Sequence, residues 1–184
     1  MVQIWDNLDY EIVLLLIKGE RHIRDIGKAL DASHSTVLRR LNRIVMENAL
    51  DYRTVGKNKV FFIKKNLEGR NYVYNAERYK LNQLVKKYPA LAVTVEDVLK
   101  KTDERLILIF GSYAKFSAKE DSDIDVYIET GSKKVKDAVE SVNSKVRVKT
   151  GDFNPGSLLI KEMIKNHVII RGVEDFYEKT RFFN

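Results

Sequence analysis

The first hydrophobic pattern of the chain predicts two helices joined by a short break. Residues 8–17 are dense in apolar side chains, which is typical of a helix facing a core, and Gly19 follows closely enough to end it. Ile23, Ile26 and Leu30 then recur at helical spacing, so one face of a second, shorter helix is apolar. Residues 31–33 are expected to form the turn after it.

A third helix is predicted to begin at Ser33, whose hydroxyl makes it a good N-cap. Its expected buried stripe consists of Val37, Leu41, Ile44 and Val45. The opposite face is predicted to carry polar side chains at positions i, i+3, i+4 and i+7, namely Thr36, Arg39, Arg40 and Arg43. Arginines on a helix that follows a tight turn are typical of a helix that reads the major groove of DNA.

A basic hairpin is predicted directly after this helix. Residues 52–55 and 60–63 are β-prone, and residues 56–58 supply the turn between them. Arg53, Lys57 and Lys59 are expected near its tip. Residues 8–65 thus resemble the winged helix-turn-helix domains of bacterial and archaeal transcription regulators. The resemblance implies that residues 1–65 bind double-stranded DNA through the basic residues named above, although some winged helices bind proteins instead.

A connecting segment is expected over residues 66–90. Periodicity is lost over residues 66–75, which contain Gly69, and helical spacing resumes over residues 76–88 until Pro89 ends it. Such a helix could pack between two domains or pair with its copy in a homodimer, and the sequence leaves both open.

The second half of the chain alternates helical and strand patterns. Thr94 and Asp97 have the spacing of a capping box that starts a helix. Residues 106–110 form an apolar run of strand length, which stops at Gly111 and Ser112. After ten more residues, Asp123 and Asp125 alternate with apolar residues, which predicts a strand that points both carboxylates to one face.

This arrangement suits a phosphate ligand with a hard cation. Two adjacent carboxylates can bind Mg²⁺ while phosphate oxygens and water complete its shell. If residues 113–118 begin a helix, their backbone N–H groups and the Ser112 hydroxyl are expected to hold the phosphates. The sequence therefore predicts a site for a Mg²⁺-bound nucleoside triphosphate.

The order Gly111-Ser112, ten residues, Asp123-Ile124-Asp125 resembles the minimal nucleotidyltransferases of the DNA polymerase β superfamily. The resemblance covers residues 91–184, with a late helix over residues 158–165 and a closing strand over residues 167–171. It implies an α+β fold with a small mixed sheet flanked by helices, and two-metal nucleotidyl transfer from a triphosphate such as ATP. In that scheme Asp123 and Asp125 are catalytic metal ligands, and Gly111 and Ser112 bind the nucleotide.

One position departs from the family pattern. The family places a third carboxylate on a later strand, and the corresponding strand here, residues 145–148, carries Arg147. Asp152 is a candidate catalytic substitute if the strand register differs, although residues 150–152 have the pattern of a turn.

Three functions therefore stay open at this point. The protein is expected to be a DNA-binding regulator or transferase with a Mg²⁺-dependent nucleotidyltransferase-like domain. Alternatively it is an inactive nucleotide sensor that controls DNA binding, or an antitoxin-like enzyme that transfers adenylate to a HEPN-type toxin. The acceptor of any transfer is a protein or a nucleic acid.

The distribution of charge predicts that the first half of the chain is the part that binds a polyanion. Residues 1–88 hold 17 Lys and Arg against 10 Asp and Glu, whereas residues 89–184 hold 16 of each. The absence of cysteine excludes disulfides and thiolate metal sites. No apolar run approaches the roughly 20 residues of a membrane span, and the N-terminus lacks the pattern of a secretion signal. A cytoplasmic protein without a membrane partner is expected.

Overall fold

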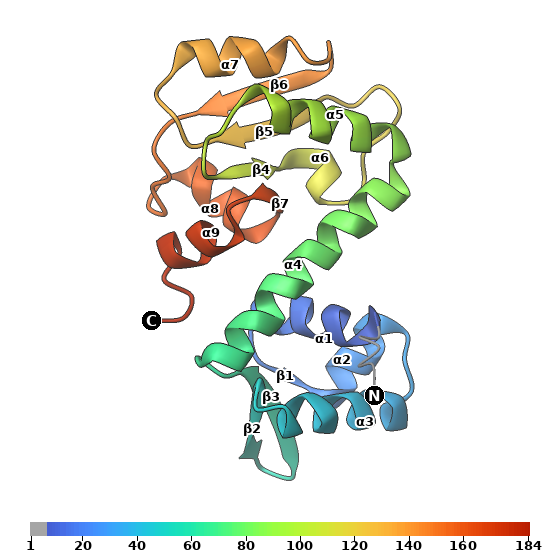
Figure 1. Ribbon diagram of the computed structural model, residues 1–184. Helices are drawn as coiled ribbons and strands as arrows, with labels where there is room; N and C mark the ends of the chain where they lie inside the picture. The colour runs from blue at the N-terminus through green and yellow to red at the C-terminus, as the bar shows by residue number, and fades with distance from the viewer. Residues whose placement is uncertain (1–6) are drawn as a thin grey trace. The chain divides into compact units, whose positions relative to one another are not determined.

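The computed structural model describes residues 7–184, which divide into two compact units (Figure 1). One unit ends at Tyr79 and also takes in Phe183–Asn184, and the other comprises Lys80–Phe182. The first six residues of the expected N-terminal domain lie outside the described part of the chain. The two units are described separately below.

The N-terminal unit contains three helices and a hairpin, followed by the first part of a long fourth helix. Its helices are α1 (Asn7–Ile17), α2 (Ile23–Leu30) and α3 (His34–Met46). A short strand β1 (Arg21–His22) precedes α2, and β2 (Leu50–Val55) and β3 (Asn58–Ile63) follow α3. The sheet is antiparallel in the order β1-β3-β2. The predicted helices and hairpin are confirmed, and β1 is an addition that the sequence pattern did not reveal.

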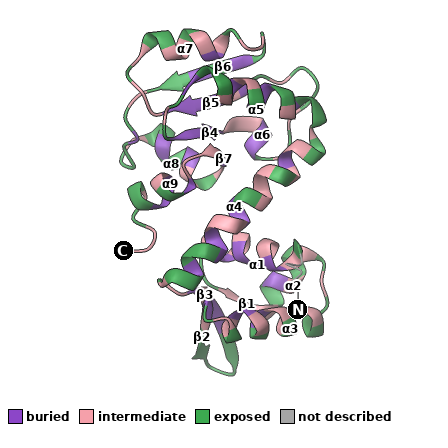
Figure 2. Ribbon diagram, viewed as in Figure 1, coloured by how far each residue is buried: buried purple, intermediate pink, exposed green. Residues whose placement is uncertain are grey.

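Apolar faces of the three helices form the core of this unit together with buried residues of the hairpin, such as Leu50 and Phe61 (Figure 2). The Ser33 hydroxyl accepts a hydrogen bond from the Thr36 backbone N–H at 3.2 Å, which confirms Ser33 as the N-cap of α3. The fully buried apolar residues of the helices are Ile12, Val13, Ile26, Val37, Leu41 and Ile44. The phase of α3 is therefore set by burying Val37, Leu41 and Ile44.

Helix α4 (Leu67–Lys87) begins nine residues earlier than the sequence predicts. The Asn66 side chain accepts a hydrogen bond from the Gly69 backbone N–H at 2.9 Å and so caps the first turn. Gly69, read as a break in the pattern, is required by packing because a Cβ there would lie 2.1 Å from the Lys64 carbonyl oxygen. The expectation of a non-helical segment over residues 66–75 was wrong because a close backbone contact looks like a helix breaker in the sequence.

The C-terminal unit is a four-stranded mixed sheet with helices on both faces (Figure 1). The strand order is β6-β5-β4-β7, with β5 and β6 parallel and the other pairs antiparallel. Its strands are β4 (Ile107–Ile109), β5 (Ile124–Ile128), β6 (Val146–Thr150) and β7 (Val168–Arg171). Its helices after α4 are α5 (Pro89–Lys101), α6 (Gly111–Ala114), α7 (Lys133–Glu140), α8 (Leu158–Lys165) and α9 (Val173–Lys179).

Alternation along β5 sends its side chains to two different environments. Ile124, Val126 and Ile128 join a buried cluster with Val98 of α5 and Val139 of α7. On the opposite face, the Tyr127 ring lies 6.1 Å from Phe153, which lies 5.6 Å from Phe176 of α9. Asp125 shares this second face with Tyr127, so the carboxylate projects from the side of the sheet that carries the aromatic cluster.

Two local predictions in this unit were wrong and two were confirmed. Helix α5 starts at Pro89, a favourable first helical residue, and Thr94 is buried inside the helix instead of capping it. Helix α6 ends at Ala114, and Phe116 then takes a left-handed backbone conformation (φ 56°), so no helix extends over residues 113–118. The late helix α8 and the closing strand β7 are where the sequence predicts them.

Candidate functional site

Gly111 and Asp125 meet where β4 ends beside the start of β5. The Phe110 backbone N–H donates to the Asp125 carbonyl oxygen at 3.0 Å, which fixes the turn against β5. Gly111 has φ +68°, and a Cβ there would lie 2.1 Å from the Asp125 Oδ2. Glycine is therefore required twice, by its backbone conformation and by the carboxylate packed against it. Residues fourteen positions apart in sequence thus form one site.

The electrostatics of Asp125 reflect its half-buried position. Burial raises the pKa of Asp125 above its ordinary value, and the negative charge of Asp123 raises it further. Lys149 and Arg147 act on the same pKa in the opposite direction. Asp125 therefore lies among charges of both signs, the carboxylate of Asp123 and the cations Lys149 and Arg147.

Asp123 lies just before β5 and pairs with an arginine from the neighbouring strand. The Arg147 Nη2 is 3.2 Å from the Asp123 Oδ1, and the two side chains are 53% and 52% exposed. In the parallel register of β5 and β6, Arg147 is the partner of Asp125, so their side chains share a face. The residue of β6 opposite Asp125 is thus an arginine and not an acid.

The structure does not bring Asp152 to this pair. Thr150, the last residue of β6, pairs with Ile128 at the far end of β5 and lies roughly 10 Å beyond Arg147 along the strand. Asp152 comes two residues after Thr150, near Tyr127. Burial raises the pKa of Tyr127, and the charges of Glu129 and Asp152 raise it further, while the Tyr127 hydroxyl donates to the Gly151 carbonyl oxygen at 2.7 Å. The alternative register that would make Asp152 a third carboxylate is therefore wrong.

Ser112 lies in the short helix α6 and is half-buried. Its carbonyl oxygen accepts a hydrogen bond from the Ser117 backbone N–H at 3.0 Å, which closes the loop after α6. Next to it, Lys115 forms an ion pair with Glu162 of α8 at 3.3 Å and lowers the pKa of that carboxyl. Gly111 lies against Asp125, and a one-turn helix replaces the longer helix that the sequence predicts. That Gly111, Ser112, Asp123 and Asp125 bind a nucleotide and its metal ion stays a prediction.

The chemistry of this donor set fits one hard cation. Asp123 and Asp125 lie two residues apart, on one face at the start of β5, and offer carboxylate oxygens, the ligands that Mg²⁺ prefers. Among residues 7–184, no group of three or more acidic, histidine or cysteine side chains is arranged to hold a metal ion. The pair therefore suits one Mg²⁺ that is shared with a phosphate ligand, whereas a second metal ion lacks its protein ligand.

The arginines of α3 do not form the single face that the sequence predicts. Arg43 forms an ion pair with Asp9 of α1, and the Asp9 side chain is completely buried. The Arg43 Nε also lies 4.0 Å from the Glu47 Oε1. Arg40 is half-buried, and Thr36 accepts a hydrogen bond from the Ser33 hydroxyl as part of the N-terminal cap. The exposed stripe of α3 is instead Ser35, Arg39, Asn42 and Met46.

This stripe could have been found from the helical phase. Ser35, Arg39, Asn42 and Met46 are spaced by four, three and four residues, opposite the buried Val37, Leu41 and Ile44. A surface hollow lies along it, lined by Ser35, Leu38, Arg39, Asn42, Arg43 and Met46. The polarity of Arg43 instead predicted that this residue belongs to the exposed face, because a long cationic side chain on a helix is usually exposed.

The basic residues of the hairpin are exposed. The turn consists of Gly56 and Lys57, and Gly56 has φ +60°. Lys59 lies over the Tyr52 ring with its Nζ 3.8 Å from the ring centre. Arg53 is held by Glu20 at 2.6 Å, so it is partly neutralised. Lys57 and Lys59 are therefore the stronger candidates for phosphate contacts.

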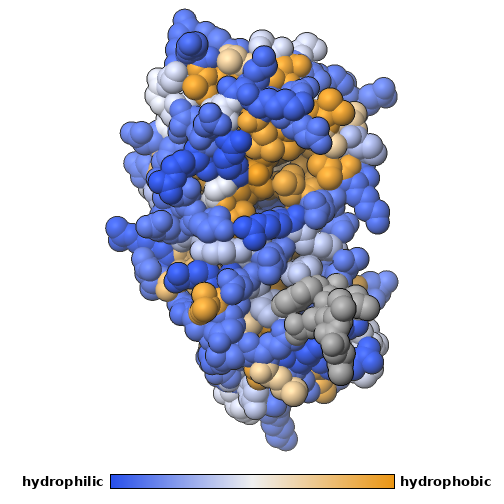
Figure 3. Space-filling model, in the orientation of Figure 1, coloured by the Kyte–Doolittle hydropathy of each residue, from blue (hydrophilic) through white to orange (hydrophobic). Residues whose placement is uncertain are grey.

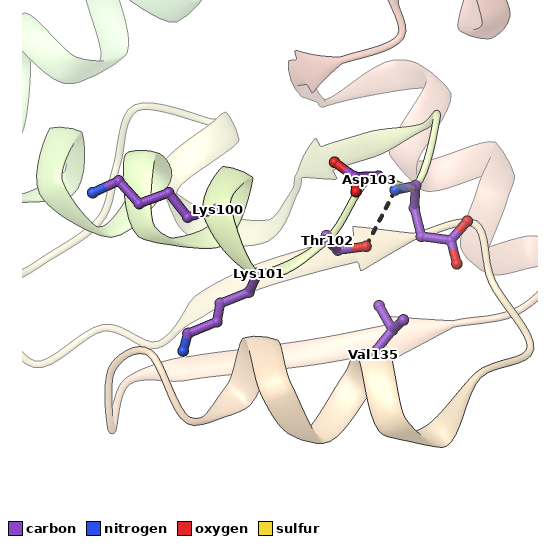
Figure 4. A pocket seen from close by; sticks show the side chains of 6 residues that line it. Lys100, Lys101, Thr102, Asp103 and Val135 are labelled. Atoms are coloured by element: carbon purple, nitrogen blue, oxygen red, sulfur yellow. Dashed lines mark hydrogen bonds between the residues drawn. The ribbon is translucent and has the colours of Figure 1, made fainter.

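Other surface features carry less chemistry. A hollow of about 450 Å³ lies at the end of α5, lined by Lys100, Lys101, Thr102, Asp103, Glu104 and Val135 (Figure 4). The side chains that line it carry charges of both signs, and the Lys100 Nζ forms an ion pair with the Asp97 Oδ1 at 3.0 Å. Apolar residues also gather near α5 and α6 (Figure 3), where Val93 is 64% exposed. Neither feature aims several polar groups at one point, so the acidic pair remains the candidate site.

Within the part of the chain that the structure describes, no helix combines the length and apolar character that a bilayer span requires. No curated protein and no solved structure gives a significant match to the chain. Residues 91–177 match the nucleotidyltransferase domain family. The matched range contains the Gly111 turn, both aspartates of the candidate site and all four strands of the mixed sheet. This part of the chain is therefore a nucleotidyltransferase domain of the polymerase β superfamily.

Proposed function

We propose that the protein binds a Mg²⁺-bound nucleoside triphosphate, such as ATP, in its nucleotidyltransferase domain and binds double-stranded DNA through its N-terminal unit. The observation that carries the nucleotide half is the contact of Gly111 with the Asp125 carboxylate inside the matched domain. Because glycine has no Cβ, the Asp125 carboxylate packs directly against the Gly111 backbone, so a cation held by Asp125 lies close to this turn and to the phosphates bound there.

Each residue of the site has a distinct part in this binding. When bound, Mg²⁺ neutralises the phosphate charge and polarises the phosphoryl groups. Asp123 and Asp125 hold the ion, the Gly111 backbone lies close to the phosphates, and Ser112 donates its hydroxyl to them. Arg147, next to Asp123, adds a cation that also attracts phosphate.

We further propose that transfer of a nucleotidyl group is weak or absent. Activation of an acceptor hydroxyl in this family pattern depends on a third carboxylate beside the first two. Arg147 is the strand partner of Asp125, and Asp152 is at the far end of the strand pair. A site that retains triphosphate without consuming it suits a nucleotide sensor.

The element order supports the DNA half of the proposal. Helix, short strand, two helices and a hairpin, with sheet order β1-β3-β2, match the arrangement of a winged helix-turn-helix domain. Arg39 and Asn42 on the exposed stripe of α3 can reach base edges, while Lys57 and Lys59 on the hairpin can contact phosphates. In this arrangement Arg43 serves the fold and not the DNA.

Calorimetric titration of the full chain with ATP tests the nucleotide half. Binding is expected with Mg²⁺ and lost with excess chelator, because the phosphates and the two aspartates repel each other without a cation. The Asp123→Asn/Asp125→Asn double variant is expected to bind at least tenfold more weakly. Asp137→Asn on the exposed face of α7 is the matched control. Equal affinity in chelator would contradict the proposal.

Gel-shift titration at several salt concentrations tests the DNA half. Arg39→Glu is expected to weaken binding at least tenfold, and the affinity of the wild type is expected to fall steeply with salt. Arg70→Glu makes the same charge change on α4 and is expected to cost less. Unchanged affinity in Arg39→Glu would contradict the assignment of α3 as the reading helix.

Incubation with α-labelled triphosphates separates the sensor from a transferase. A sensor leaves protein and nucleic acid unlabelled. Strong labelling of a nucleic acid or of a partner protein would instead identify a transferase, including the antitoxin-like adenylyltransferase as the protein-modifying case.

A further inference from the structure

Arg147 is held in a defined position beside the acidic pair. Its Nη1 donates to the Ser144 carbonyl oxygen at 2.6 Å and to the Val146 carbonyl oxygen at 3.1 Å, while its Nη2 lies 3.2 Å from Asp123. Two backbone acceptors and one carboxylate thus orient a side chain that is still half-exposed. An exposed arginine without such partners would sample many rotamers.

The strand register directs this guanidinium toward the site. Arg147 pairs with Asp125 in the parallel ladder, and β6 is the edge strand of the sheet. Lys149, the next residue on that face, is the partner of Tyr127, so the cationic side of β6 runs along the acidic side of β5. Both cations act on the electrostatics of Asp125.

A guanidinium has consequences for cation binding that a carboxylate does not. It is always protonated and carries only donors, so it cannot ligate a metal ion. Its charge repels a second divalent cation at this end of the sheet, and it competes for Asp123. It binds phosphate in a bidentate manner, however, and so supplies positive charge to the phosphates by another route.

We propose that Arg147 replaces the second metal ion of this site, so that the protein binds the triphosphate with one divalent cation and one fixed guanidinium. This inference rests on the nucleotide binding proposed above. It assigns Arg147 as a phosphate-binding residue and explains why two carboxylates are sufficient here.

Counting Mn²⁺ at the filled nucleotide site tests the inference directly. The full-length protein is saturated with a non-hydrolysable triphosphate analogue and titrated with Mn²⁺, and free Mn²⁺ is followed by electron paramagnetic resonance. The wild type is expected to bind one Mn²⁺ per bound nucleotide. Arg147→Asp, which adds a ligand and removes the repelling charge, is expected to bind two.

Two control variants isolate the position and the charge. Lys134→Asp makes an equal change of charge on α7, which covers the other face of the sheet, and is expected to keep one Mn²⁺. Arg147→Gln removes the cation without adding a carboxylate, and is expected to lower affinity for the analogue about tenfold, the loss of one charge-assisted phosphate contact. Circular dichroism establishes that each variant is folded.

The outcomes separate this inference from the proposed function. Two Mn²⁺ in the wild type, one in folded Arg147→Asp, or undiminished analogue affinity in Arg147→Gln would each overturn the role of Arg147 alone. If the wild type bound no analogue at all, the proposed function would fail and this inference with it.

Discussion

An arginine–aspartate pair occurs in each unit, and the two pairs have different surroundings. In the N-terminal unit, Arg43 is 35% exposed and reaches Asp9, which is fully buried. In the nucleotidyltransferase domain, Arg147 and Asp123 are both about half exposed, at 53% and 52%. The same two side-chain types therefore serve a fold in one unit and a candidate site in the other.

Solvation explains the difference. A buried carboxylate without its partner is left desolvated and uncompensated, which costs several kcal/mol. An exposed pair is screened by water and contributes little, so either member can be used by a ligand without loss of the fold. Both pairs consist of an arginine and an aspartate, so the residue types do not distinguish them. Whether a pair stabilises the fold or can bind a ligand depends on whether one partner is buried.

The largest expected effect is on the stability of the N-terminal unit. Arg43→Met is expected to lower the free energy of unfolding by about 3–5 kcal/mol, because it leaves the Asp9 charge buried alone. Denaturant unfolding measures this. The double variant Asp9→Leu/Arg43→Met, which removes both charges, is expected to recover most of the loss. If Arg43→Met lowered the free energy of unfolding by less than about 1 kcal/mol, the Arg43–Asp9 pair would contribute no more to stability than an exposed pair such as Arg147–Asp123.

A smaller loss is expected at the Gly111 turn. Gly111→Ala forces an alanine into a left-handed conformation and brings its Cβ against Asp125, which costs about 2 kcal/mol or more. ATP affinity is expected to fall with it. Gly131→Ala is the matched control, because no atom lies within 4 Å of a Cβ there. Thermal melts compare the stability of the two variants, and calorimetry compares their ATP affinity. Equal stability and equal affinity in both variants would contradict the requirement for glycine at position 111.

Tyr79 and Glu11 provide an intermediate case, since both side chains are half-buried. Burial and a 3.0 Å hydrogen bond to Glu11 raise the pKa of Tyr79 from 10.0 to about 12. The unfolded chain therefore loses this proton at lower pH than the folded protein does. The resulting stability is fully present below pH 10 and is lost as the pH rises through about 12.

Unfolding free energies measured across this alkaline range test the assignment. Tyr79→Phe is expected to show a shallower decline than the wild type. An identical decline in both proteins would mean that Tyr79 has the same pKa in the folded and unfolded states.

The smallest effect on stability is expected at the exposed pair. Arg147→Gln is expected to change the free energy of unfolding by less than about 1 kcal/mol, although the same change weakens nucleotide binding. Denaturant unfolding compared with Arg43→Met measures the contrast. A loss as large as that of Arg43→Met would assign Arg147 to the fold and not to the site.

Much of the fold follows from local patterns in the sequence. The apolar periodicity of residues 8–46 located α1, α2 and α3, and alternation around Asp125 located β5. The spacing from Gly111 to Asp125 indicated the candidate site, because one turn and one strand alternation depend only on neighbouring residues. The sequence pattern gave a wrong prediction at Gly69, which it marked as a break in the helix. Glycine is required there because the Lys64 carbonyl oxygen lies too close for a Cβ.

Tertiary structure decided which charged side chains are available. Nothing in the sequence near Arg43 indicates that Asp9, on another helix, pairs with its guanidinium and so engages its charge. The parallel register of β5 and β6 likewise brings Arg147 to the acidic pair and carries Asp152 away from it. Residue types and periodicity determine the elements, whereas the free energy of a charge depends on the burial and partners that only the packed chain creates.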